Sequence, residues 1–268
     1  MRLIVIGDIH VQPEKLWQML RSAGLADERN KPTETLREGD VRLVLLGDLV
    51  HAKSRERYAD LINVRRYDEY NPRHLERAEK VQERFLREVK GFQDRLPEGR
   101  MTIIMGNHDF NAITEEQGPL RTDDVAHLEW KPGYGNALDP ELKEWISSWP
   151  YEVMVEGLHL AHVGPLPEHN TYDQSFYLEN RRRWIQEDKD FFEDSEYRLG
   201  IYGHTPVRGG VNVASQGRAL LLDTNGHKSE QVYLEVIIKP DGYRLKLQGL
   251  FFDELIPRLD DEEKQVKV

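Results

Sequence analysis

Side chains that bind metal ions or transfer protons follow five apolar runs of the sequence. They are Asp8 and His10 in GDIH, Asp48 in GDLVH, Asn107 and His108 in GNHD, His162 in AHVGP and His204 in YGHTP. Carboxylate, imidazole and amide ligands together suit Mn, Fe, Zn or Mg better than copper or calcium. The set exceeds what one ion needs, so it predicts two ions with Asp48 as a natural shared ligand. Two ions about 3.5–4 Å apart would polarise a phosphoryl group and ionise a bridging water for in-line attack.

Three of these groups follow apolar runs in the first half of the chain, over residues 3–6, 41–46 and 101–105. Such runs are typical of strands that are buried on both faces, as in parallel sheets. Residues 13–24 and 74–96 have helical periodicity, which predicts a β-α-β-α-β order. The carboxyl ends of adjacent parallel strands share one edge, where ligands bind. We therefore expect the polar side chains to converge there.

The second half of the chain predicts more strands. Residues 140–149 and 174–194 predict helices, and strands are expected within 151–163 and over 199–202, 219–223, 232–238 and 243–251. Residues 51–73 and 110–139 are expected to be long insertions. No break in composition divides the chain, so we expect one domain over residues 1–252. The charged end, residues 253–268, predicts a surface helix or a frayed tail.

Composition excludes several classes of protein. The 268 residues include no cysteine, which rules out disulfides, thiolate zinc sites and a cysteine nucleophile and fits a cytoplasmic protein. The net charge of −11 argues against a broad nucleic-acid surface. No apolar run approaches the roughly 20 residues that span a membrane, and the N-terminus reads as a strand rather than a signal peptide.

The motifs together resemble the calcineurin-like metallophosphoesterase superfamily. GDIH, GDLV, GNHD, AHVGP and YGHTPV occur in family order across residues 7–207. LLLDTNG, residues 220–226, resembles the closing strand and turn of the phosphoprotein phosphatase and diadenosine tetraphosphatase branch. The resemblance implies a four-layer α-β-β-α sandwich with two mixed sheets and two divalent ions. Manganese is expected first, with iron, zinc, nickel or magnesium as alternatives.

The resemblance also assigns roles to residues. Asp8, His10 and Asp48 would hold the first ion, and the second would be held by Asp48, Asn107, His162 and His204. His108 would be the general acid that protonates the departing oxygen or stabilises the charge growing on it.

Two departures from the family pattern matter. Pro206 stands where the nuclease and cyclic-nucleotide branches have a second histidine. His51 and Ala52 stand where the phosphatase branch has an acid that orients the catalytic histidine and an arginine that grips phosphate. Asp109 is our candidate for the missing acid. Lys53 or Arg55 would replace the missing arginine. The family also has a second arginine that binds phosphate after the AHVGP histidine, for which the candidates are Arg181, Arg182 and Arg183. His51 is expected to face the substrate or to support a ligand rather than to bind a metal ion.

We expect hydrolysis of a phosphomonoester or a phosphoanhydride by a hydroxide that bridges the metals. The substrate would be a small molecule, a nucleotide, a phosphoprotein or a nucleic-acid end. A phosphodiesterase or nuclease is one alternative, and a metal-binding scaffold with weak catalysis is another. Of the other histidines, His159 is expected to be structural, and His127 is expected to lie at the surface with His74, His169 and His227.

Overall fold

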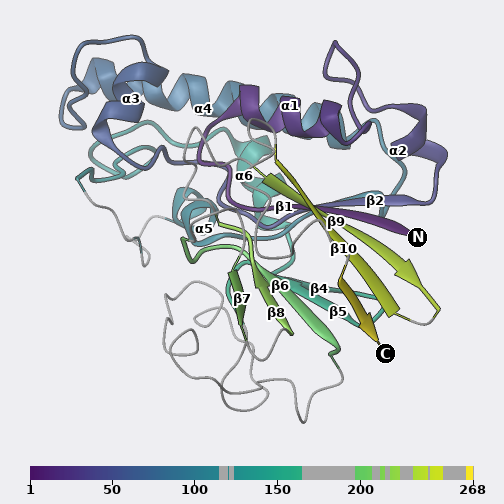
Figure 1. The fold of residues 1–268 in the computed structure, drawn as a ribbon. Helices are drawn as coiled ribbons and strands as arrows, with labels where there is room; N and C mark the ends of the chain where they lie inside the picture. The colour runs from purple at the N-terminus through teal and green to yellow at the C-terminus, as the bar shows by residue number, and fades with distance from the viewer. Residues whose placement is uncertain are drawn as a thin grey trace.

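Two β-sheets stack face to face in the computed structural model, and helices cover the outer face of one of them (Figure 1). The structure describes residues 1–114, 120, 124–164, 197–206, 212–214, 218–223, 232–240, 242–249 and 264–267. The strand orders are β11-β10-β9-β1-β2-β3 and β4-β5-β6-β8-β7. This arrangement confirms the predicted α/β fold with two mixed sheets. The helix predicted over 174–194 lies outside the described residues.

The six-stranded sheet has a parallel half and an antiparallel half. β1 (Arg2–Ile6), β2 (Val41–Leu45) and β3 (Met101–Ile103) run parallel to one another. β9 (Val232–Lys239), β10 (Gly242–Gly249) and β11 (Lys264–Lys267) add antiparallel strands beyond β1. Since β11 lies within the segment expected to be a surface helix or frayed tail, that prediction is wrong for these four residues.

The five-stranded sheet has a parallel centre. β5 (Leu158–Ala161), β6 (Leu199–Tyr202) and β8 (Ala219–Leu221) are parallel neighbours. β4 (Glu152–Val155) and β7 (Asn212–Ala214) pair with them in the antiparallel sense at the two edges. β7 was not predicted from the sequence.

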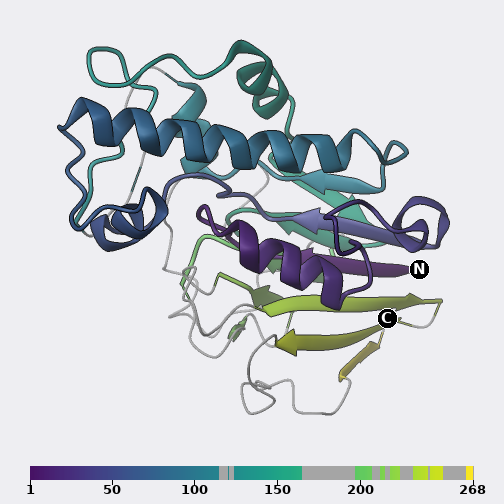
Figure 2. The ribbon, with the colours of Figure 1, turned by 90° about the horizontal axis from the view of Figure 1, so that it is seen from above.

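The helices that cover the six-stranded sheet are α1 (Pro13–Ser22), α4 (Pro72–Gln93) and α6 (Pro140–Ser147) (Figure 2). Each begins with proline, which is preset for the first turn and has no N–H to leave unpaired. Asn71 and Asp139 cap α4 and α6 by accepting backbone N–H groups. The shorter helices α2 (Glu34–Glu38), α3 (Arg55–Leu61) and α5 (Asn107–Ile113) were not predicted.

Strand β1 shows how the core fixes the strand ends. Ile4 and Ile6 pack among the helices, while Leu3 and Val5 pack between the two sheets. Burial of such a side chain stabilises the fold by about 1.5–3 kcal/mol. Because β1 is covered on both faces, its register is fixed, and so is the point at which the chain leaves the sheet.

Candidate metal centre

The structure brings all six predicted metal ligands to the carboxyl ends of parallel strands. Asp8 and His10 follow β1, Asp48 follows β2, Asn107 starts α5 after β3, His162 follows β5 and His204 follows β6. The backbone N–H of His204 donates to Asp8 Oδ1 at 3.0 Å, so ends of strands from the two sheets are in direct contact.

Asp8, His10 and Asp48 form the first group of candidate ligands. His10 Nε2 lies 3.6 Å from Asp8 Oδ2 and 3.6 Å from Asp48 Oδ2. His10 Nδ1 lies 3.0 Å from the carbonyl oxygen of His51, so Nδ1 donates its hydrogen and Nε2 keeps a lone pair. His10 Nε2 and Asp8 Oδ2 are buried and have no hydrogen-bond partner. Buried polar atoms left in this way are costly unless a cation lies among them.

Asn107, His162 and His204 form the second group, around the same Asp48. Asn107 Oδ1 lies 3.0 Å from His162 Nε2 and 2.9 Å from His204 Nδ1, and the two nitrogens are 3.2 Å apart. His162 Nε2 is also 3.4 Å from Asp48 Oδ2. Ligand atoms that bind one metal ion at 2.0–2.2 Å typically lie about 3 Å from one another. The residues therefore fit two cations, with Asp48 Oδ2 facing both groups.

The charges of the centre favour bound cations. Burial lowers the pKa of His10 to about 4 and of His204 to about 3, which keeps both imidazoles in the neutral form that binds metals. Burial also raises the pKa of Asp8 to about 6. At His162 burial would lower the pKa, but the carboxylates of Asp48 and Asp8 outweigh it and raise the pKa to about 10. The two carboxylates thus attract positive charge to the place where the candidate ligands meet.

The loops that carry the ligands have unusual backbone geometry. Nine described residues other than glycine have positive φ, and five of them are at or beside the centre: His10, Val11, Asp48, His51 and His204. Such conformations cost about 1–3 kcal/mol each and cluster at functional sites. Gly203 is required for a different reason, because a Cβ there would lie 2.4 Å from Asp8 Oδ1.

Asp109 shapes the loop after β2. Its carboxylate accepts hydrogen bonds from the backbone N–H groups of Asp48 at 2.6 Å, Leu49 at 2.9 Å, Val50 at 3.3 Å and Gly106 at 3.2 Å. It therefore ties the loop that carries Asp48 to the start of α5. These contacts support a structural role in place of the orienting role that we predicted for Asp109.

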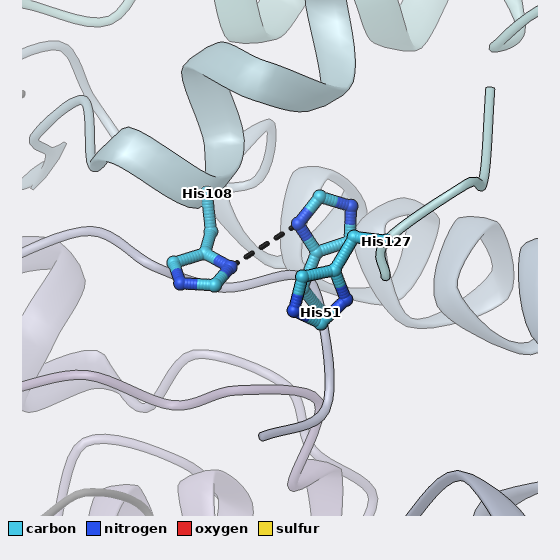
Figure 3. Close-up of side chains that lie close together, drawn as sticks. All are labelled: His51, His108 and His127. Carbon is cyan, nitrogen blue, oxygen red and sulfur yellow. Dashed lines mark hydrogen bonds between the residues drawn. The ribbon is translucent and has the colours of Figure 1, made fainter. Parts of the chain in front are cut away.

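The ring of His108 faces another histidine. His108 Nδ1 lies 3.2 Å from His51 Nδ1 (Figure 3). The other ring nitrogen of His108, Nε2, lies 4.0 Å from Asp48 Oδ2 in the metal centre. The ring of His127 stacks on His51 with centroids 4.4 Å apart and 12° between the planes. His127 Nδ1 is 2.9 Å from the hydroxyl of Tyr58. His127 is only 4% exposed, so the prediction that it lies at the surface is wrong.

His51, His108 and His127 offer ring nitrogens within 4.8 Å of one another, a spacing compatible with a further ion. The lone pair of an imidazole nitrogen lies in the plane of its ring. Because the rings of His51 and His127 are nearly parallel and stacked, one ion cannot lie in both planes. We therefore interpret the three rings as a packed support for His108 rather than as a third metal site.

The predicted substrate-binding residues have different surroundings. The positive charge of Lys53 contributes to lowering the pKa of Asp8, His10 and His108, which places it close to the centre. Arg55 instead donates from Nε and Nη2 to the buried carboxylate of Glu69, inside the 51–73 insertion. Residues 181–183 lie outside the described residues. His159 makes bonds to Tyr202 and Glu152, which supports the structural role we expected.

Glu129, in the 110–139 insertion, is a fully buried carboxyl group. It accepts from Gln82 at 3.3 Å, its Oε2 has no hydrogen-bond partner, and burial raises its pKa to about 7 from 4.5. Because the pKa of Glu129 is higher in the folded protein than in the unfolded chain, its contribution to stability is fully present below the unfolded pKa and is lost as the pH rises through the folded pKa. At high pH the ionised, buried carboxylate therefore lowers the stability of the folded protein. We expect Glu129→Gln to raise the free energy of unfolding by about 3 kcal/mol at pH 8 and by much less at pH 5. Urea denaturation at both pH values measures this, with the exposed Glu98→Gln as control.

Comparison with known proteins establishes the family. The calcineurin-like phosphoesterase family matches residues 1–237, so the chain belongs to this family. The fold is similar to that of a cold-active protein-tyrosine phosphatase of a psychrophilic Shewanella species, with a TM-score of 0.59 and 14% identity over 93% of this chain and 78% of that one. It is also similar to a protein serine/threonine phosphatase of Saccharomyces cerevisiae, with a TM-score of 0.51 and 12% identity over 93% and 80%.

Curated protein sequences give no match to this chain. The family establishes a phosphoester hydrolase, and the histidine and aspartate clusters could hold divalent ions. Among the described residues, no helix has the length and apolar character that crossing a membrane requires.

Two residues near the centre were missed in the sequence. His127 lies in the 110–139 insertion, where no periodic pattern distinguishes buried from exposed positions. Arg57, which lines a pocket next to His10, belongs to α3 in the insertion after GDLVH. The basic residues of KSRER, residues 53–57, could have indicated an anion-binding segment, but the sequence does not show which arginine lies in the pocket.

Proposed function

We propose that this protein is a dinuclear metal-dependent phosphatase that hydrolyses phosphomonoesters or phosphoanhydrides. The observation that carries the proposal is the position of Asp48 Oδ2, which faces His10 on one side and His162 on the other. Asp8 completes the first set of ligands, and Asn107 and His204 complete the second. Two bound divalent ions would polarise the phosphoryl group and lower the pKa of a water molecule.

The chain's own groups would position the substrate and stabilise the leaving group. Lys53 would attract the phosphoryl oxygens to the centre. His108 would donate a hydrogen bond from its Nε2–H to the departing oxygen and so stabilise the negative charge that grows on it. Burial lowers the pKa of His108 well below its usual range, so the ring is neutral and carries a single proton. That proton is on Nε2 only if Nδ1 accepts a hydrogen bond.

His51 would be the positioning residue that fixes this proton. Its Nδ1 is 3.2 Å from His108 Nδ1, and donation from His51 leaves the proton of His108 on Nε2. The backbone N–H of His51 donates to Gln82 at 2.7 Å, and stacking on His127 holds the ring. In this reading a neutral donor replaces the acid that the family has at this position.

Variants of His51 test this role. We expect His51→Ala to lower kcat about 10- to 100-fold, with KM and metal content nearly unchanged. His51→Asn should retain most of kcat, because its amide can donate from nearly the same place and asparagine tolerates the φ of 62° at this residue. Equal losses in the two variants, or a loss of metal in either, would contradict the positioning role.

The test of the function itself compares two substrates. Protein loaded with manganese should hydrolyse p-nitrophenyl phosphate faster than bis(p-nitrophenyl) phosphate and should lose activity on chelation. The reverse preference would indicate a phosphodiesterase. No turnover of either ester, or of nucleotides and phosphoproteins, would favour a metal-binding scaffold.

A further inference from the structure

A pocket lies directly beside the candidate metal centre. It has a volume of about 460 Å³ and shares His10 with the centre. The loop after β1 and the start of α1 form one side, and Ala52 and α3 form the other. Small organic ligands occupy pockets of about 300–1,000 Å³. A molecule whose phosphoryl group lies at the metal centre would therefore have room for its organic part here.

Arg57 in this pocket lacks an acceptor for part of its guanidinium group. Its Nη1 is buried and has no hydrogen-bond partner. Burial lowers the pKa of Arg57, and the exposed Glu56 offsets this only in part. By contrast, Arg55 is paired with Glu69 and Arg87 with Asp139. A partly buried guanidinium without an anion costs free energy, which a bound anion would recover.

The other residues that line the pocket favour a ligand with both apolar and anionic parts. Val11, Pro13 and Leu61 provide apolar surface, and Lys15 provides a second positive charge. Two carboxylates also line the pocket, Glu14 on α1 and Asp60 on α3, and they limit where an anion can bind. Arg57, whose Nη1 has no hydrogen-bond partner, is therefore the position that we consider for an anion.

We propose that this pocket binds the leaving-group part of the substrate and that Arg57 binds a second anionic group on it. The inference rests on the proposed phosphatase function and narrows its substrate class. The substrate would be a phosphoester that carries, a few bonds from the scissile phosphate, a second phosphate or a carboxylate. The fork of arginine matches two oxygens of either group.

Binding of non-hydrolysable phosphonates tests this proposal. Calorimetry with the full chain loaded with manganese would compare alkane-α,ω-diphosphonates of one to six carbons with the alkylphosphonates of the same length. We expect one spacer length to bind at least about tenfold tighter as the diphosphonate. ω-Carboxyalkylphosphonates of that length then distinguish a carboxylate from a phosphate as the second group. If no length in either series gains over its monophosphonate, the proposal is overturned.

Three variants test whether Arg57 is the residue that binds the second anionic group. Arg57→Gln should abolish the gain, and Arg57→Lys should keep a smaller one, because lysine retains the charge but not the fork. Arg66→Gln, which removes the same charge from an exposed position, should keep the full gain. A gain that survives in Arg57→Gln, or disappears in Arg66→Gln, would contradict the assignment. Thermal melting of each variant verifies that it is folded.

Failure of the phosphatase proposal can be distinguished from failure of this one. Hydrolysis of p-nitrophenyl phosphate reports on the metal centre and needs no second anion. If the protein hydrolyses p-nitrophenyl phosphate but no diphosphonate binds more tightly than its monophosphonate, the proposed anion site is wrong and the proposed phosphatase function is retained. A gain that depends on Arg57 in a protein without hydrolysis supports the anion site and counts against the phosphatase.

Discussion

Replacing Asp48 with asparagine is expected to lower kcat for a phosphomonoester by about a thousandfold or more and to reduce bound metal from two ions per chain to one or none. The substituted side chain can still accept from the backbone N–H of His108, which lies 2.9 Å from Asp48 Oδ1. It cannot supply the negative charge that faces both His10 and His162. Steady-state kinetics and elemental analysis of the same samples measure the two effects.

Asp94→Asn is the matched control, because Asp94 is exposed at the end of α4 and pairs there with Lys90. Its activity and metal content should equal those of the unaltered protein. Retention of both ions in Asp48→Asn would show that the two groups of ligands do not share this carboxylate, and the dinuclear proposal would then fail.

Replacing His108 with alanine is expected to lower kcat by about 10²–10³ for substrates with poor leaving groups, because no hydrogen bond from this position then stabilises the charge on the departing oxygen. The loss should be much smaller for p-nitrophenyl phosphate, because p-nitrophenolate is stable without such a donor. Metal content should not change, since His108 would not be a ligand in this proposal. The measurement is kcat for phenyl phosphate and p-nitrophenyl phosphate with each protein.

His74→Ala is the control for this experiment, because His74 lies on α4 and contacts the backbone N–H of Asp68. A loss in His108→Ala that is equal for both substrates would indicate that the ring holds the phosphoryl group instead of the departing oxygen. A loss of one ion would make His108 a ligand.

The alternating order of strands and helices and the convergence of the six candidate ligands could be predicted from the sequence for physical reasons, whereas the two mixed sheets were implied by the family resemblance. Strands buried on both faces appear as continuous apolar runs, as in β1 and β2, and their ends are easily located. Asp8 and Asp48 stand at those ends, so the topology of a parallel sheet brings them together whatever the intervening segments do. The convergence of the ligand side chains could therefore be predicted without knowledge of the loop structures.

The surroundings of His108 could not be predicted in the same way. His127 comes from an insertion with no hydrophobic period, and its position depends on tertiary contacts with Tyr58 and His51. Asp109 was expected to contact a side chain, but the turn that starts α5 directs its carboxylate to backbone amides. Sequence spacing fixes which residues are near, whereas side-chain direction depends on local backbone geometry.

The bond from the backbone of His204 to Asp8 joins the carboxyl ends of strands that belong to different sheets. Four candidate ligands come from one sheet and two from the other, so a pair of bound cations would cross-link the two sheets. Loss of the ions would then lower the stability of the fold as well as stop turnover. Melting with and without chelator should show a lower midpoint for the stripped protein.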